Sequence, residues 1–285
     1  MLWNSVHDAG GGRPNEDHVA VIERGGVADI LVLDGATALV DAGNAGGGDD
    51  VVWFVQRFAK EFERGVDAGI DRGALLTSAA RATASAWRAA TARREMPAYA
   101  WPVASLAWLR IVQRPDGGAD VVFTSLGDCK TLLRRPDGAV RDLDPIDNAQ
   151  ETALYAEVAA LRAQGVDDPV ERFARMLPLL RARRAAQNLD PAPVVLSVRP
   201  QGPFAVRETA FHAPAGSLLL AMTDGFWRLV DPYGLYTAQA LMDACATGGP
   251  AHLLRALRVF ESGEGGAGSL AVKRADDASA VACWV

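Results

Sequence analysis

Two Pro-Asp-Gly turns divide the middle of the sequence into four apolar runs and limit the folds that the chain can adopt. The runs "VASLAWLRIV" and "ADVVFTSLG" flank the turn at 115–117, and "CKTLLR" and "AVRDL" flank the turn at 136–138. Proline sets φ at the first corner of a turn and glycine tolerates positive φ, so each turn predicts an antiparallel hairpin. A doubly wound parallel sheet, in which helices alternate with strands, is therefore disfavoured.

In the rest of the chain, too, helices do not alternate with strands. The segment 18–35 reads as two strands around a Gly-Gly turn, and two helical patterns follow at 49–65 and 73–95. After the hairpins come a helical, charged insert, further strands, two helices at 237–246 and 251–260, and a last strand. This order favours packed antiparallel sheets with pairs of helices outside them.

Length and composition indicate a globular chain with a sizeable core. The 285 residues suit one domain over 1–285, with the helical insert at 149–190 inside it, and 49% of the residues are hydrophobic. The net charge is −6 and no long basic run occurs, which argues against a nucleic-acid partner. No signal peptide and no apolar stretch long enough for a bilayer is present, so we expect a cytoplasmic protein without a membrane partner.

The cysteines indicate neither a zinc site nor a disulfide framework. Cys129, Cys245 and Cys283 are odd in number and far apart, and no Cys-x-x-Cys spacing occurs. A reducing, intracellular setting fits this usage best.

Acidic residues occur where apolar strands begin or end. One Asp-Gly pair after a strand is typical of a turn, but five such segments in one chain are harder to explain in that way. Converging carboxylates repel one another unless a cation neutralises them, and ligands that are all oxygen suit Mg²⁺, Mn²⁺ or Ca²⁺ rather than zinc. The segments are "NED" at 15–17, "LVLDGAT" at 31–37, "FTSLGDCK" at 123–130, "LLLAMTDG" at 218–225 and "RADDASAVACWV" at 274–285.

These motifs resemble, in order, those of the metal-dependent PP2C-type (PPM) serine/threonine protein phosphatases, in a bacterial-type form. The resemblance rests on "RPNEDH", "LVLDGA", "SLGDCK", "LAMTDG" and "DDASAV" and runs from residue 13 to residue 281. It implies an α+β fold, a four-layer αββα sandwich of two antiparallel sheets flanked by helix pairs, with the insert 149–190 in the place of the family's flap.

The resemblance also implies a two-metal centre of Mn²⁺ or Mg²⁺ ions. Asp34 looks like the carboxylate that bridges the two ions, and Glu16 would hold the second ion together with the Gly35 carbonyl. Asp224 and Asp276 would complete the ligands of the first ion. Two such ions lower the pKa of a shared water and clamp the phosphoryl oxygens for in-line attack, so no protein nucleophile is needed.

Three more residues acquire roles from the resemblance. Asp17 would orient the attacking water, and Asp128 matches an acid linked to a third, weaker metal site. Arg13 matches a phosphate-binding arginine, but it lies three residues before Glu16, where the family usually has four. The general-acid histidine of many eukaryotic members is absent, because "DGATA" replaces "DGHGG". We interpret His18 as a structural strand residue.

The arginine-rich stripe of the insert, "RFARMLPLLRARRAAQ", has two interpretations. The favoured one is an amphipathic helix that packs on the body of the protein and leaves its arginines in water. The other is an element that docks a substrate or a partner beside the metal site.

Three functional hypotheses remain open at this point. The first is an active phosphatase, most simply a monomer, that acts on phosphorylated proteins or on a small phosphorylated molecule. The second is a pseudophosphatase, a binding module with the same fold and no turnover. The third is a haloacid-dehalogenase-type phosphatase, which is disfavoured because that mechanism needs a second aspartate where this chain has Ala36.

Overall fold

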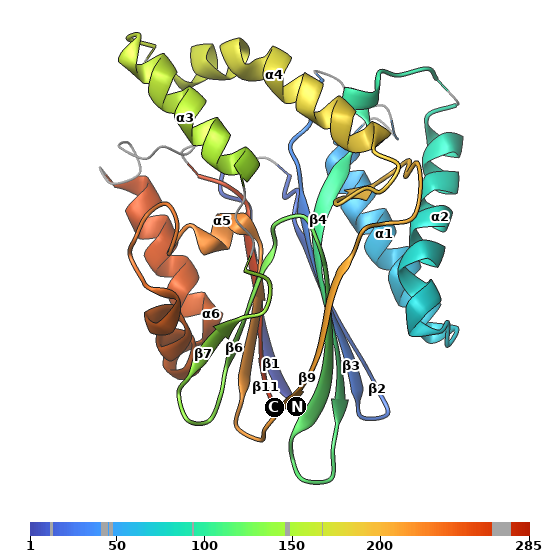
Figure 1. Cartoon of the computed structure of the whole chain (residues 1–285), viewed down its shortest axis with the longest axis vertical. Helices are drawn as coiled ribbons and strands as arrows, with labels where there is room; N and C mark the ends of the chain where they lie inside the picture. Colours follow the sequence, from blue (N-terminus) through green and yellow to red (C-terminus); the bar gives the residue numbers. More distant parts are fainter. Residues whose placement is uncertain are drawn as a thin grey trace.

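The computed structural model describes residues 1–11, 14–40, 45, 48–92, 94–145, 149–166, 168–263 and 275–285. Two sheets stand face to face at its centre (Figure 1), and every paired strand within them is antiparallel. One sheet has the order β1 (Leu2–Asp8), β11 (Ala278–Trp284), β10 (Leu218–Met222), β6 (Lys130–Arg134) and β7 (Val140–Asp142). The other has the order β2 (His18–Arg24), β3 (Val27–Gly35), β4 (Val103–Gln113), β5 (Ala119–Leu126) and β9 (Arg207–Ala213), with β8 (Leu196–Ser197) beside β4.

Helices cover both outer faces of the pair of sheets. In Figure 1, α1 (Asp50–Asp67) and α2 (Arg72–Ala90) lie against the β2–β9 sheet, and α5 (Asp224–Trp227) and α6 (Ala238–Ser262) lie against the other. Three buried clusters fill the spaces between these layers, one between the two sheets and one under each helical layer. The predicted α+β class and the four-layer αββα sandwich are confirmed.

The hairpins form for the reasons that the sequence indicates. In the turn between β4 and β5, Arg114 N–H donates to the Gly118 carbonyl at 2.8 Å, and Gly117 has φ of +86°. In the turn between β6 and β7, Arg135 N–H donates to the Ala139 carbonyl at 2.9 Å. Each turn joins antiparallel neighbours, as the Pro-Asp-Gly pattern predicts.

The first helix shows how local sequence and packing agree. The Asp49 side chain caps α1 by accepting from Val51 N–H at 2.8 Å, which satisfies a donor that has no partner within the helix. Phe54, Phe58 and Phe62 follow at intervals of four residues and are buried. This stripe packs on the sheet, where the ring of Phe62 meets Trp108 at 5.0 Å between centroids.

The structure contains two elements that the sequence did not predict, β1 and the four-residue helix α5. β1 was not predicted, because an edge strand with exposed side chains carries no clear apolar alternation; Leu2 at its start is 75% exposed. The two helices expected at 237–246 and 251–260 both form within α6, which is interrupted where Gly249 has a non-helical φ of +68° and Pro250 follows.

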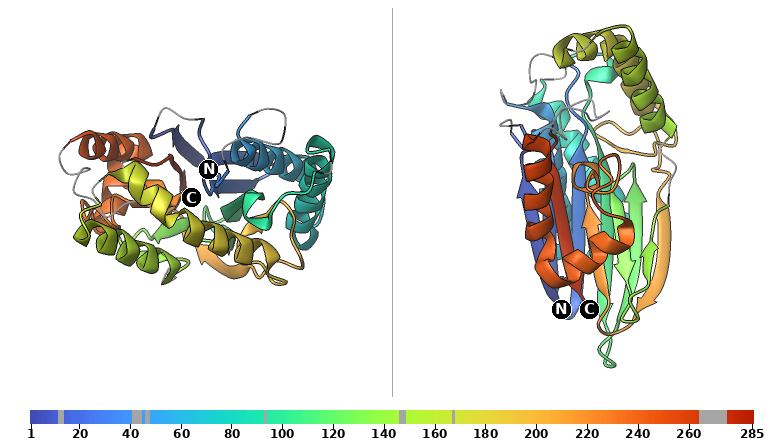
Figure 2. Two further views of the ribbon diagram at one scale, coloured as in Figure 1. Left: turned by 90° about the horizontal axis from the view of Figure 1, so that it is seen from above. Right: turned by 90° about the vertical axis from the view of Figure 1, so that its left-hand side faces the viewer.

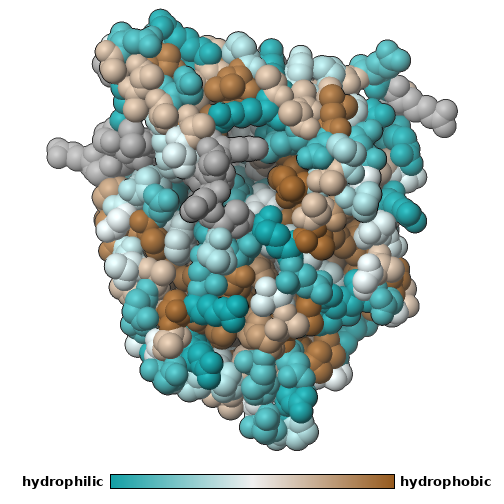
Figure 3. All heavy atoms as spheres, in the orientation of Figure 1, coloured by the Kyte–Doolittle hydropathy of each residue, from teal (hydrophilic) through white to brown (hydrophobic). Residues whose placement is uncertain are grey.

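The helices α3 (Ala149–Ala163) and α4 (Pro169–Leu189) cross one edge of the sandwich, and Figure 2 shows them passing over both sheets when seen from above. α4 packs on the short 3₁₀ turn η1 (Ala98–Ala100). On the face drawn in Figure 3, hydrophobic residues form small groups between hydrophilic ones, as on a surface that faces water. None of the described helices combines the length and the apolar character needed to span a bilayer.

Candidate functional site

The acidic motifs meet at one edge of the sandwich, although they are far apart in the sequence. At this edge β2 and β11 begin and β3, β5 and β10 end, whereas the two chain termini lie at the opposite edge in Figure 1. α3 and α4 lie above the same edge. The sheets therefore bring together the segments that hold the predicted site residues.

Backbone contacts fix the segment that contains Glu16. Its N–H donates to Asp277 Oδ2 at 2.6 Å, which ties the start of β2 to the start of β11 in the other sheet. Its carbonyl accepts from Gly35 N–H at 3.1 Å, and its carboxylate Oε2 accepts from the Thr37 hydroxyl at 2.6 Å. The Glu16 side chain is consequently held beside the end of β3.

A second set of contacts joins the ends of β3 and β10. The N–H of Asp224 donates to Asp34 Oδ2 at 3.1 Å, so the carboxylate of Asp34 faces the turn that contains Asp224. One residue earlier, the Thr223 hydroxyl donates to Asp17 Oδ2 at 2.9 Å. Asp17 is only 3% exposed, so this contact fixes the direction of a buried carboxylate.

The electrostatics of these acids favour a cation at the site. Burial raises the pKa of Asp34 well above its usual range, and the charges of Asp224, Asp17, Asp128 and Asp276 raise it further. Burial also raises the pKa of Asp17 well above its usual range, although a hydrogen bond from Thr223 acts in the opposite direction. Carboxylates in this state are stabilised either by protons or by a positive ion.

Two glycines allow the backbone to close around the acids. A Cβ atom on Gly35 would collide with the Glu16 carbonyl oxygen and with Val51. A Cβ atom on Gly225 would collide with the carbonyl oxygen of Asp277. Both positions need glycine because the neighbouring backbone approaches too closely for any side chain.

Asp128 is held at the end of β5 by a different strand. The hydroxyl of Ser105, on β4, donates to Asp128 Oδ1 at 2.6 Å. The next residue, Cys129, is 1% exposed, and burial raises the pKa of its thiol well above the usual range. Cys129 thus packs as a small apolar residue beside the acids.

Asp276 has a partner that the sequence did not indicate. Arg228 Nη2 donates to Asp276 Oδ2 at 2.7 Å, and Asp277 N–H donates to Asp276 Oδ1 at 3.2 Å. Arg228 follows Asp224 by one helical turn and its side chain is 11% exposed. Helical spacing places Arg228 on the same face as Asp224, but nothing in the sequence indicates that it pairs with Asp276.

The donor set fits a divalent cation chemically, because it consists of carboxylates and of carbonyls exposed by glycines. In the part of the chain that the structure describes, however, no three His, Cys, Asp or Glu side chains stand in an arrangement that would hold a metal ion. Side chains of the site already bind N–H, hydroxyl and guanidinium donors. Metal binding therefore requires some of these partners to be exchanged.

The arginines of the insert do not all lie in water, so the favoured interpretation of this stripe is wrong in part. Arg184 donates to the carbonyls of Ala36 and Thr37 at 3.3 and 3.4 Å, directly after the end of β3. Burial lowers its pKa to about 10, although the charge of Glu16 acts in the opposite direction. Arg181 donates to the Leu39 carbonyl at 2.9 Å. α4 is thus attached to the loop that follows Asp34.

The other predicted residues have simpler outcomes. Arg13, the predicted phosphate clamp, lies outside the described residues. His18 begins β2, and its ring lies 6.5 Å from that of His7 between centroids. Burial lowers the pKa of His18, and the neighbouring His7 lowers it further.

Comparison with known proteins agrees with the motifs. The family model described as protein phosphatase 2C matches residues 7–258. A search of the curated proteins finds no match.

Solved structures share the fold over nearly the whole chain. The serine/threonine phosphatase PstP/Ppp of Mycobacterium tuberculosis is 17% identical with a TM-score of 0.55, over 99% of this chain and 97% of that chain. A catalytic domain of PstP in complex with two manganese ions is 18% identical with a TM-score of 0.55, over 99% and 96%. The S. agalactiae serine/threonine phosphatase is 14% identical with a TM-score of 0.56, over 100% and 99%. Because the family model covers most of the sequence and the fold agrees, the chain belongs to the protein phosphatase 2C family and to its class of metal-dependent serine/threonine phosphatases.

Proposed function

We propose that this chain is an active phosphatase that hydrolyses phosphoserine and phosphothreonine on proteins. The observation that carries the proposal is the convergence of Glu16, Asp17, Asp34 and Asp224 at one edge of the sandwich, held there by hydrogen bonds between segments of the two sheets. Buried acids that repel one another destabilise the folded protein unless a cation neutralises them. Their presence together favours a site that has a chemical use for them.

Five residues would hold two divalent cations, Mn²⁺ or Mg²⁺. Asp34 would bridge them, Glu16 and the Gly35 carbonyl would hold one, and Asp224 and Asp276 would hold the other. When bound, the ions supply a water of lowered pKa and neutralise the charge of the phosphoryl oxygens. Asp128, fixed by Ser105, would contribute to a weaker third site.

The chain's own contribution to the reaction is positioning. Asp17 is buried and its Oδ2 accepts from Thr223, so its carboxylate has one orientation in which to align a water for attack. Arg13 remains the predicted clamp for the substrate phosphate. Arg184 attaches the insert to the loop after Asp34, and α4 would therefore contact a phosphoprotein bound at this edge.

One observation favours a second candidate function. Asp276 is paired with Arg228 rather than presented to a cation, and this arrangement suits a pseudophosphatase that has kept the fold without turnover. The two candidates differ in one measurable property, because only the first predicts hydrolysis that depends on metal.

The test is hydrolysis of an aryl phosphate and of phosphoserine, phosphothreonine and phosphotyrosine peptides, each with Mn²⁺, with Mg²⁺ and with EDTA. We expect turnover with Mn²⁺ on the phosphoserine and phosphothreonine peptides, none in EDTA, and none for Asp34→Asn or Asp224→Asn. Asp137→Asn is the matched control, because Asp137 lies in the exposed turn between β6 and β7 and an asparagine keeps its contact with Ala139 N–H.

The outcomes separate the hypotheses. Activity that persists in EDTA, or in both site variants, would refute the metal-dependent reaction. Bound Mn²⁺ without turnover on any of these substrates would favour the pseudophosphatase. Turnover of the aryl phosphate alone would direct the search to a small phosphorylated molecule.

A further inference from the structure

A buried guanidinium lies at the predicted metal site. Arg228 Nη2 donates to Asp276 Oδ2 at 2.7 Å, and Arg228 lies one helical turn after Asp224 in the sequence. A guanidinium keeps its positive charge in a folded protein. Arg228 therefore carries its charge within reach of two predicted ligands of the same ion.

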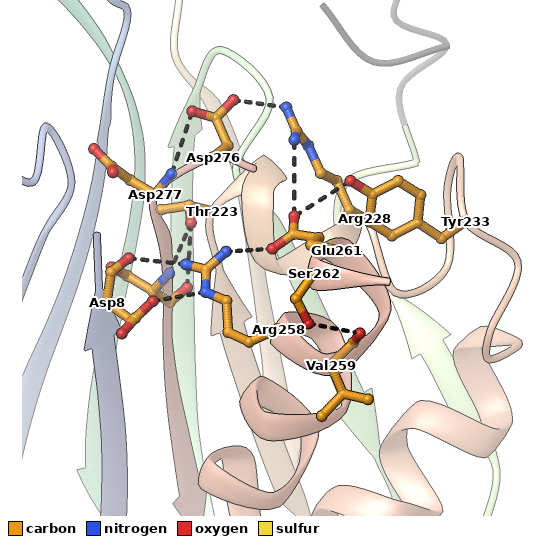
Figure 4. A network of polar contacts seen from close by, with 11 residues as sticks. Asp8, Thr223, Arg228, Tyr233, Arg258, Val259, Glu261, Ser262, Asp276 and Asp277 are labelled. Atoms are coloured by element: carbon orange, nitrogen blue, oxygen red, sulfur yellow. Dashed lines mark hydrogen bonds and ion pairs between the residues drawn. The ribbon is translucent and has the colours of Figure 1, made fainter. Parts of the chain in front are cut away.

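A network on the opposite side keeps Arg228 in place (Figure 4). Its Nη1 lies 3.9 Å from Glu261 Oε1, which also accepts from the Tyr233 hydroxyl at 3.2 Å. The other oxygen of Glu261 accepts from Arg258 Nη1 at 2.6 Å, and Arg258 Nε donates to Asp8 Oδ1 at 2.6 Å. Glu261 is 3% exposed, so the negative charge that faces Arg228 is itself fixed.

The simplest interpretation of the Arg228–Asp276 pair is structural, since it joins α5 to the start of β11. It leaves unexplained why the acid in the pair is one that the motifs assign to a metal. A positive charge next to a ligand carboxylate repels a dication and occupies the oxygen that the ion would bind. Both effects weaken the binding of the ion.

We propose that Arg228 is a positioning residue that supplies a resident positive charge at the Asp224 and Asp276 side of the site, so that this chain binds its two cations unequally. The ion at Glu16 and Asp34 binds first and more tightly, because the arginine near it, Arg184, donates to the carbonyls of Ala36 and Thr37. The ion at Asp224 and Asp276 binds weakly, because Asp276 must leave Arg228. The inference rests on the proposed function only in taking these acids as the ligands.

The expected effect of removing the charge is large enough to measure. A unit charge that faces a dication across a few ångströms of protein, at an effective dielectric constant of about 20, changes affinity by more than tenfold. We therefore expect Arg228→Gln to tighten the weaker Mn²⁺ step by at least about tenfold, which is about 1.4 kcal/mol. Glutamine removes the positive charge and keeps a polar, hydrogen-bonding side chain at this position.

The experiment is a titration of the metal-free protein with Mn²⁺. Binding is measured by calorimetry and by the electron paramagnetic resonance signal of unbound Mn²⁺. We expect two unequal steps for the wild type, two more nearly equal steps for Arg228→Gln, and a weak second step retained in Arg228→Lys, which keeps the charge. Arg258→Gln is the matched control: Arg258 belongs to the same network but binds Glu261 and Asp8 rather than Asp276. It should unfold at a lower temperature with both Mn²⁺ steps unchanged.

Each result supports or overturns the inference. Equal Mn²⁺ affinities in the wild type and in Arg228→Gln would overturn it, and so would weaker binding in the variant, which would mean that Arg228 helps Asp276 to bind the ion. If Arg228→Gln does not fold, Arg228→Met replaces it as a neutral side chain of similar length. If no variant binds Mn²⁺ at all, the wild type included, the proposed function fails rather than this inference.

Discussion

Replacing Asp34 by asparagine should have opposite effects on stability with and without metal. The side chain lies among acids whose charges raise its pKa, and its Oδ2 accepts from Asp224 N–H at 3.1 Å. Asparagine keeps an oxygen for that donor and removes the charge. The metal-free variant should therefore be more stable than the metal-free wild type, although it has lost its predicted function.

The magnitude follows from the charges and the length of the chain. Two like charges about 5 Å apart at an effective dielectric constant of about 20 repel by about 3 kcal/mol. The wild type relieves part of this repulsion by binding a proton, so we expect a gain of about 1–2 kcal/mol in the free energy of unfolding. For a chain of 285 residues, the entropy of unfolding is about 0.6 kcal/mol per kelvin, so Tm should rise by about 2–3 °C in EDTA.

Bound Mn²⁺ should make the wild type more stable than Asp34→Asn. A Mn²⁺ concentration of about 100 times Kd stabilises the folded wild type by about 2.7 kcal/mol for each occupied site, or about 4–5 °C in Tm. Because Asp34 is the predicted bridge between the ions, the variant should lose most of this shift. Differential scanning fluorimetry in EDTA and in a Mn²⁺ series measures both effects, with Asp137→Asn as the control.

The pH dependence gives an independent check with a defined sign. A carboxylate whose pKa is raised in the folded state binds a proton more readily there than in the unfolded chain, so its destabilising effect is greatest above the raised pKa. The difference in Tm between Asp34→Asn and the wild type in EDTA should thus shrink as the pH falls from neutral. A metal-free variant that is less stable than the wild type at neutral pH, or one that keeps the full Mn²⁺ shift, would refute the reasoning.

Three further predictions concern the surroundings of the site. Arg184→Met should lower the free energy of unfolding in urea by about 1–3 kcal/mol, because it removes the donor that attaches α4 to the loop after Asp34, and an unchanged midpoint would show that this contact is dispensable. Gly225→Ala should lower Tm and abolish aryl-phosphate hydrolysis, because its Cβ would collide with the Asp277 carbonyl, whereas Gly69→Ser, at a position with φ of +68° and open space around it, should lower Tm but leave the activity unchanged. The three cysteines are buried, and burial raises the pKa of each thiol, so a disulfide reagent at pH 8 should label none of them until urea unfolds the protein.

Local sequence patterns predicted the elements whose folding is governed by neighbours in the chain. The Pro-Asp-Gly turns at 115–117 and 136–138 produce the expected hairpins, since their backbone preferences are intrinsic. The phenylalanine stripe of α1 produces an amphipathic helix for a similar reason. β1 escaped detection because its side chains are largely exposed, and its strand conformation comes from pairing with β11 at the other end of the chain.

The candidate site divides in the same way. The residue types and their order along the chain indicated the acids and a cation-dependent chemistry, because carboxylates next to glycines at strand ends have few other uses in such number. The partners of these acids were not predictable. Arg228 and Arg184 reach the site from α5 and from the insert, and no periodicity distinguishes either from an arginine in water.

The sequence by itself determined the αββα fold and the family, and it predicted the set of acids, since turn chemistry, apolar periodicity and motif order are properties of the chain. Only the tertiary structure decided which carboxylate meets which donor. Asp277 accepts from Glu16 N–H, Asp34 accepts from Asp224 N–H, and Asp276 accepts from the Arg228 guanidinium. The reason is that these contacts join residues from different sheets and helices. Their geometry depends on how the layers pack, and packing is encoded by the whole core rather than by any local segment.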